Sequence, residues 1–224
     1  MKNPLASFAL MFAVVAAPEQ ASGRSNPTGE SMNANAIAVR SRTLVAPMQA
    51  LDIIDFWTEA GPALWFAKDP AFDARFRERY LGLYEAAARG ESTNWGATPD
   101  GALALVLLLD QFPRNAFRGT ARMYATDSMA RAAARAAIES GFLERVPREL
   151  QKFFVLPFAH SEDDADQARS VQLAKRVGPE ELARAQHHRD IVRRFGRFPH
   201  RNKILGRVST KAEQDYLDNG GYAG

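Results

Sequence analysis

Apolar residues recur along most of the chain at the three- to four-residue spacing of amphipathic helices. The first such stretch carries Leu51, Ile54, Phe56 and Trp57, and we expect its helix to end near Gly61–Pro62. Further helices are predicted at about residues 70–89, 99–109, 127–139, 148–158, 162–177, 179–195 and 210–217. No stretch alternates apolar and polar residues for long enough to indicate a sheet. The pattern therefore predicts an all-α fold of about eight helices, packed as a bundle or an array of antiparallel hairpins.

Capping residues sharpen several of these boundaries. Asp69 and Thr98 each precede a proline, which is the usual start of a helix. Ser161 is expected to cap the helix that follows it, within a capping box. Residues 102–109 are apolar on every side and are predicted to form the central buried helix. Residues 219–221, Asn-Gly-Gly, are expected to end the ordered chain.

The first 46 residues differ in character from the remaining 47–224, which we expect to form a single helical domain. Lys2 precedes an apolar run over residues 5–17 that has the length of a signal-peptide core. Export through residues 1–23 is one interpretation. The other is translation from Met32, which would leave a cytoplasmic protein. In both cases residues 1–46 are expected to be a disordered leader outside the core.

Composition excludes some chemistry and leaves most of it open. The chain has no cysteine, which excludes disulfides, thiol nucleophiles and cysteine-ligated metals. The net charge of +3 does not by itself identify a partner. No apolar run reaches the roughly 18 residues expected of a membrane-spanning helix. No cofactor is indicated.

One short motif occurs twice with a single insertion: Phe-Pro-Arg-Asn at 112–115 and Phe-Pro-His-Arg-Asn at 198–202. Both copies follow an apolar helical pattern, so each proline is expected to end its helix and to leave the Arg and Asn in the exit loop. Loops held by rigid helices often carry binding groups. The candidate ligand-binding residues are Arg114, Asn115, Arg197, His200, Arg201 and Asn202.

Asp110 follows the most apolar segment and is expected at a helix C-terminus, where the helix dipole opposes a negative charge. A carboxylate in that position needs a cation or several hydrogen-bond donors. Arg114 is close in sequence, and Arg201 is a more distant candidate. Asp110 is interpreted either as half of a structural ion pair or as a catalytic or ligand-orienting group.

Two histidines are candidate catalytic bases. On a helix over 179–195, His188 falls in the middle of the apolar face, where it needs a partner such as Asp110 or His160. It is either a satisfied core histidine or a base. His160 precedes Glu162, which either complements a helix N-terminus or forms an acid–base or metal-ligand pair with His160. No HExxH or other metal signature is present, so no metal site is predicted.

Basic residues dominate the segment from Arg193 to Lys211, which contains no acid before position 213. Arginine side chains match the oxygens of carboxylates and phosphates, so this run favours a small anionic ligand over a nucleic-acid backbone. The alternative is a solvated face that is partly neutralised by the acids at 162–166.

These segments together resemble a known family, DUF924. The motifs that carry the resemblance are Ile-Ile-Asp-Phe-Trp at 53–57, Leu-Asp-Gln-Phe-Pro-Arg-Asn at 109–115, Leu-Pro-Phe-Ala-His-Ser-Glu-Asp at 156–163 and the segment 188–202. The resemblance covers about residues 51–217. It implies a TPR-like all-helical fold in soluble cytosolic bacterial proteins, and it implies no biochemical function.

Two hypotheses follow. The first is an enzyme or small-anion-binding protein, with His188 or His160 as base, Asp110 as the orienting group, and Arg114 and Arg201 as an anion clamp. The second is a TPR-like scaffold that binds an acidic peptide or protein. Polar side chains that converge on a cavity without partners favour the first hypothesis, and side chains that satisfy one another favour the second.

Overall fold

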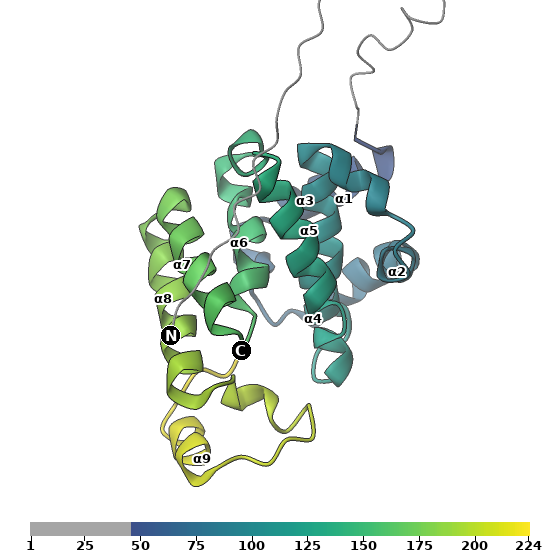
Figure 1. Ribbon diagram of the computed structural model, residues 1–224. Coiled ribbons are helices and arrows are strands. Elements are labelled where there is room, and N and C mark those ends of the chain that lie inside the picture. Colours follow the sequence, from purple (N-terminus) through teal and green to yellow (C-terminus); the bar gives the residue numbers. More distant parts are fainter. Residues whose placement is uncertain (1–45) are drawn as a thin grey trace, which may run out of the picture. The chain divides into compact units, whose positions relative to one another are not determined.

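The computed structural model describes residues 46–224 (Figure 1). The predicted leader, and with it both interpretations of the N-terminus, lies almost entirely outside the described residues. The helices are α1 (Met48–Trp65), α2 (Pro70–Ala88), α3 (Pro99–Val106), α4 (Phe112–Ala116), α5 (Asp127–Glu139), α6 (Lys152–Ala159), α7 (Asp164–Val177), α8 (Pro179–Phe195) and α9 (Lys211–Asp218). No strand occurs in this part of the chain, so the predicted all-α fold is confirmed. None of these helices is both long enough and apolar enough to span a membrane.

The most apolar helix lies at the centre, as predicted. Every residue of α3 from Gly101 to Val106 is buried, and α3 contacts α1, α5 and α6. α7 and α8 form an antiparallel hairpin at the edge of the bundle, joined at Gly178 (Figure 1). An aromatic cluster between α1, α2, α4 and α6 contains Trp57, Phe76, Phe112 and Phe153.

The prediction that Pro113 ends its helix is wrong. α3 continues through a π-helical turn, Leu107–Gln111, directly into α4. Pro113 lacks the N–H that would bind the carbonyl of Leu109 in an α-helix. That carbonyl instead accepts a hydrogen bond of 2.6 Å from the hydroxyl of Thr126. Helical structure therefore runs from residue 99 to residue 116, and eight separate helical rods remain among the described residues.

This correction moves three candidate residues. Asp110 lies inside the π-helical turn rather than at a helix C-terminus, so the helix dipole does not explain its environment. Arg114 and Asn115 lie on α4 rather than in an exit loop. In the second copy of the motif, α8 does end at Gly196, with a left-handed φ of 71°. Arg201 then lies in the 3-10 turn Pro199–Arg201.

Two smaller predictions can be compared with the backbone. As predicted, helical geometry stops at Gly61–Pro62, where Gly61 has a φ of 68° and a ψ of 175°; the further turn that carries Trp65 follows this break and is counted with α1. The indole N–H of Trp65 donates to the carbonyl of Trp57 at 2.6 Å. α7 is capped by Asp163, whose carboxylate accepts from the N–H of Asp166 at 3.0 Å, and not by Ser161.

We predict that Phe76→Ala destabilises the protein by about 3–5 kcal/mol, because it removes a buried ring and leaves a cavity. Phe76 is fully buried and its ring packs against Trp57, Phe72 and Phe112. Urea unfolding followed by circular dichroism measures the change. The control is Val208→Ala, at a position that is 88% exposed, which should change the free energy of unfolding by less than about 0.5 kcal/mol. Equal effects of the two substitutions would contradict the core assignment.

Candidate functional site

A cavity of about 550 Å³ lies where the ends of α1, α4 and α6 meet the middle of α8 and the turn at 199–201. All four histidines of the chain line it: His160, His187, His188 and His200. Apolar wall is supplied by aromatic side chains, including Trp65, Tyr124, Phe198 and Tyr222. The size suits a small molecule, because ligand pockets usually measure about 300–1,000 Å³.

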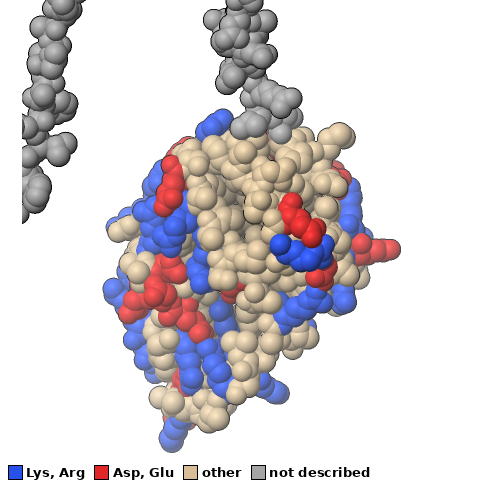
Figure 2. Space-filling model, turned by 45° about the vertical axis from the view of Figure 1, so that its right-hand side comes forward, with Lys and Arg blue, Asp and Glu red and all other residues tan. Residues whose placement is uncertain are grey.

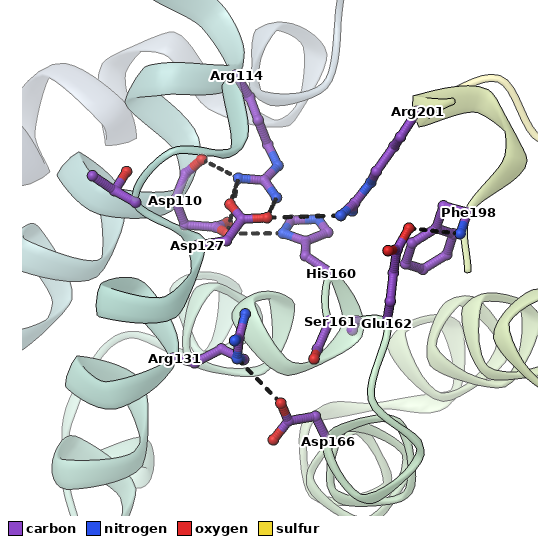
Figure 3. A network of polar contacts seen from close by, with 12 residues as sticks. Asp110, Arg114, Asp127, Arg131, His160, Ser161, Glu162, Asp166, Phe198 and Arg201 are labelled. Carbon is purple, nitrogen blue, oxygen red and sulfur yellow. Dashed lines mark hydrogen bonds and ion pairs between the residues drawn. The ribbon is translucent and has the colours of Figure 1, made fainter. Parts of the chain in front are cut away.

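Arg114 lines the cavity and is held between two carboxylates, as Figure 3 shows. Its Nη1 lies 3.1 Å from Oδ1 of Asp110 and 2.9 Å from Oδ1 of Asp127. Its Nη2 donates to Oδ2 of Asp127 at 3.1 Å, and Nη1 also donates to the main-chain carbonyl of Asp110 at 2.7 Å. The predicted Asp110–Arg114 ion pair is therefore present. Asp127 completes it from the first turn of α5.

Asp110 is fully buried and does not line the cavity. Its Oδ1 lies 2.8 Å from Nδ1 of His160, and its Oδ2 accepts from the side-chain amide of Gln111 at 2.5 Å. Burial opposes ionisation, but the charge of Arg114 and these hydrogen bonds outweigh it and hold the pKa of Asp110 below its ordinary value. Asp110 is therefore a carboxylate at neutral pH, and it orients His160.

The state of His160 follows from this contact. Because Asp110 is ionised, Nδ1 of His160 must carry the proton and donate it, which leaves the lone pair of Nε2 free. Burial and the positive charge of Arg114 lower the pKa of His160, while Asp110 opposes that shift. His160 is thus a neutral imidazole at pH 7, and it borders the cavity.

His188 is buried, with 8% of its surface exposed; neither ring nitrogen makes a well-formed hydrogen bond, and only the main chain of Arg184 is close enough for a weak one. The expectation that Asp110 or His160 would be its partner is wrong. Asp110 is taken by His160, whose ring meets that of His188 edge-on at 6.3 Å between centroids. Tyr222 and Phe198 pack against the same imidazole at 5.0 and 5.7 Å. Burial lowers the pKa of His188 to about 3.

Arg201 is also buried, with 7% of its surface exposed, and its Nε has no partner. The guanidinium lies between the rings of Tyr124 and Phe198, at 4.6 and 4.5 Å from their centroids. It points toward Asp127, with Nη1 at 3.8 Å from Oδ2, and makes no ion pair with Asp110 (Figure 3). Burial and the neighbouring charge of Arg114 lower the pKa of Arg201.

The remaining predicted residues divide between the cavity and its surroundings. His200 and Asn115 line the cavity, and the amide of Asn115 also donates to Asp73 at 2.8 Å. Glu162 does not line it and does not pair with His160. Its carboxylate instead binds Arg207 at 2.7 Å and the main-chain N–H of Phe198 at 2.8 Å.

Arg197 and Asn202 also lie away from the cavity. Arg197 forms a bidentate ion pair with Glu213, at 2.6 and 2.8 Å. Asn202 is fully buried and donates to Ser209 at 3.1 Å. Part of the basic segment is thus neutralised within the protein. On the face drawn in Figure 2, basic side chains lie beside acidic ones along the left-hand flank and in a patch on the right, while the upper middle is uncharged.

Sequence reasoning missed Tyr124, Asp127 and Tyr222 as parts of the site. Asp127 was visible only as a helix start, and Tyr124 lies in a short 3-10 turn that carries no periodic signal. Tyr222 follows the point where order was expected to end, and that expectation is wrong. Its N–H donates to the hydroxyl of Tyr216 at 2.9 Å, and its ring packs on His187, His188 and His200.

The side chains that line the cavity include five basic ones: Lys68, Arg114, Arg118, Arg184 and Arg201. Two of them are ion-paired, Arg114 with Asp110 and Asp127 and Arg118 with Asp73 at 2.8 Å. None of the lining residues is an aspartate or a glutamate. Within residues 46–224, no group of three or more His, Asp or Glu side chains is arranged to hold a metal ion.

Fold and site together define an all-α bundle with a cation-lined, histidine-rich pocket of small-molecule size. The chain belongs to the family described as "Bacterial protein of unknown function (DUF924)", which matches residues 53–221. A solved structure described as a protein of unknown function, ATU0120 from Agrobacterium tumefaciens, is similar at 53% identity and a TM-score of 0.76. The alignment covers 77% of this chain and 98% of that one. Among curated proteins, none matches the chain.

We predict that acidification from pH 7 to pH 5 destabilises the protein in part through His188. Its pKa is about 3 when folded and about 6.5 when unfolded, so the unfolded state binds more protons between those values. Protonation of His188 in the unfolded state therefore costs almost no stability well above pH 6.5. At pH 5 it lowers the free energy of unfolding by about 2 kcal/mol. His188→Phe should abolish that part of the loss in urea unfolding at the two pH values. His187→Phe, at an exposed position, is the control. Equal losses in wild type and His188→Phe would refute the assignment.

Proposed function

We propose that the pocket binds a small organic anion, with its carboxylate or phosphate group against Arg201 and its apolar part between the aromatic walls. The observation that carries the proposal is the lining itself, which has five basic side chains and no acid; Lys68 and Arg184 make no ion pair within the described residues. The guanidinium of Arg201 has Asp127 only at 3.8 Å, so an anion in the cavity would complete its neutralisation.

His160 supports the same proposal. Its Nδ1 is bonded to Asp110, so the lone pair of Nε2 is available to a hydrogen-bond donor of a ligand in the cavity that His160 borders. The aromatic side chains of the lining favour a ligand with a flat or apolar body.

The scaffold for an acidic peptide remains the second candidate, with less support. Such a scaffold needs a continuous basic groove, whereas Arg197 and Arg207 are already paired with Glu213 and Glu162. The cations that make no ion pair within the described residues, Lys68 and Arg184, line the cavity instead. An acidic peptide nevertheless belongs in any ligand screen, because Lys68 and Arg184 are exposed at the rim and make no ion pair within the described residues.

We predict that benzoate, phenylpyruvate or phenyl phosphate raises the melting temperature, and that Arg201→Gln weakens their binding about 10- to 100-fold. That loss corresponds to one hydrogen-bonded charge contact of roughly 1.5–3 kcal/mol. Thermal-shift screening followed by titration calorimetry measures it.

The matched control is Arg194→Gln, which removes the same charge from an exposed site outside the cavity and should leave the affinity unchanged. Circular dichroism checks that both variants fold. The proposal fails if no small anion binds, if only a short Glu-rich peptide binds, or if Arg201→Gln and Arg194→Gln behave alike.

A further inference from the structure

Three of the five cations that line the cavity keep most of their charge. Arg201 has only one carboxylate near it, that of Asp127 at 3.8 Å. Lys68 and Arg184 make no ion pair within residues 46–224. The other two cations of the lining are each bound to carboxylates at 2.8–3.1 Å and have little charge left for a ligand. What the cavity offers an anion therefore depends on where the first three lie.

Lys68 and Arg184 lie together at one end of the cavity. Arg184 is on α8, four residues before His188 and so about 6 Å nearer to the start of the helix. Its guanidinium lies 5.5 Å from the ring centroid of Phe66, which directly follows α1, and Lys68 is two residues further along the chain. Both side chains belong to exposed residues. Lys68 and Arg184 are called the rim cations below.

Arg201 lies on the other side of His188. It belongs to the turn that follows the end of α8, and its guanidinium is 4.5 Å from the ring centroid of Phe198. Phe198 packs against the last two turns of α8, and its ring lies 5.7 Å from that of His188. The cavity thus has a buried cation at one end and the rim cations at the other. A single carboxylate bound to Arg201 would leave the rim cations without a counter-charge.

We propose that the ligand of this cavity carries two anionic groups on a flat or apolar body, one in contact with Arg201 and the other with the rim cations. This inference rests on the anion-binding function proposed above and narrows its ligand class to small dianions, such as aromatic dicarboxylates and carboxyaryl phosphates.

The wall between the two ends suits the uncharged body of such a ligand. Trp65, Phe198 and Tyr222 all line the cavity, and aromatic rings pack well against flat or apolar groups. Burial lowers the pKa of His188 and of His200 to about 3, so both imidazoles are neutral at pH 7. A volume of about 550 Å³ accommodates a small molecule with a group at each end.

The experiment compares pairs of ligands that share one body and differ by one anionic group. The pairs are terephthalate and its monomethyl ester, biphenyl dicarboxylate and its monomethyl ester, and carboxyphenyl phosphate and phenyl phosphate. Titration calorimetry with the full-length protein measures each affinity at pH 7. We expect the dianion of at least one pair to bind about 3- to 10-fold more tightly than its partner, because exposed ion pairs each contribute only modestly.

The double variant Lys68→Gln/Arg184→Gln locates the second anionic group. It should abolish the preference for the dianion and change the affinity for the ligand with one anionic group less than about twofold. Arg201→Gln should weaken binding of both members of the pair. The matched control is Arg193→Gln/Arg194→Gln, which removes the same charge from exposed positions on α8 outside the cavity and should keep the preference. If the first double variant does not fold, Lys68→Gln alone should still reduce the preference.

The outcomes separate the two proposals. Equal affinity for both members of every pair overturns the two-charge inference, and so does an equal loss of preference in the rim variant and its control. Either result leaves anion binding intact if the ligands bind and Arg201→Gln weakens them. If wild type binds no small anion at all, both proposals are overturned.

Discussion

The structure around the pocket depends on one buried charge arrangement, in which Arg114 lies between Asp110 and Asp127. Each of these groups is expensive to take out of water, and each is tolerated because the others neutralise it. The arrangement also joins three elements: the long helix that carries Asp110 and Arg114, the start of α5, and the end of α6 through His160. Loss of one member would leave an uncompensated buried charge, which typically costs about 3–5 kcal/mol.

The same arrangement decides what the pocket presents to a ligand. Asp110 and Asp127 both bind Arg114 and do not line the cavity. The lining therefore contains basic side chains and histidines but no aspartate or glutamate. The guanidinium of Arg201 is held in place between the rings of Tyr124 and Phe198. Its positive charge is only partly neutralised, because Asp127 is 3.8 Å away. Arg201 differs in this from structural ion pairs that neutralise each other at short distance, as Arg197 and Glu213 do.

The π-helical turn shows how far a local rule can be overridden. Proline normally ends a helix because it lacks an N–H and crowds the preceding turn. At Pro113 the freed carbonyl of Leu109 is satisfied by Thr126, a residue on another segment. π-helical turns are often found at functional sites, and this one carries Asp110. The sequence of residues 109–115 alone cannot predict that hydrogen bond, because its donor, Thr126, lies outside the segment.

The sequence by itself determined the all-α class, most helix boundaries, the buried central helix and the family, because periodicity and capping are local properties. It also singled out Asp110, Arg114, His160, His188 and Arg201, whose residue types or spacing stand out against an apolar background. Only the tertiary structure decided which partner each residue takes. Asp110 is hydrogen-bonded to His160 rather than to His188, and Glu162 forms an ion pair with Arg207 rather than with His160. Asp127, seen in the sequence only as a helix start, and Tyr222, beyond the last predicted helix, were added to the site by the tertiary structure. Ion pairing and ring packing act across space between residues far apart in the chain, so they leave no periodic trace in the sequence.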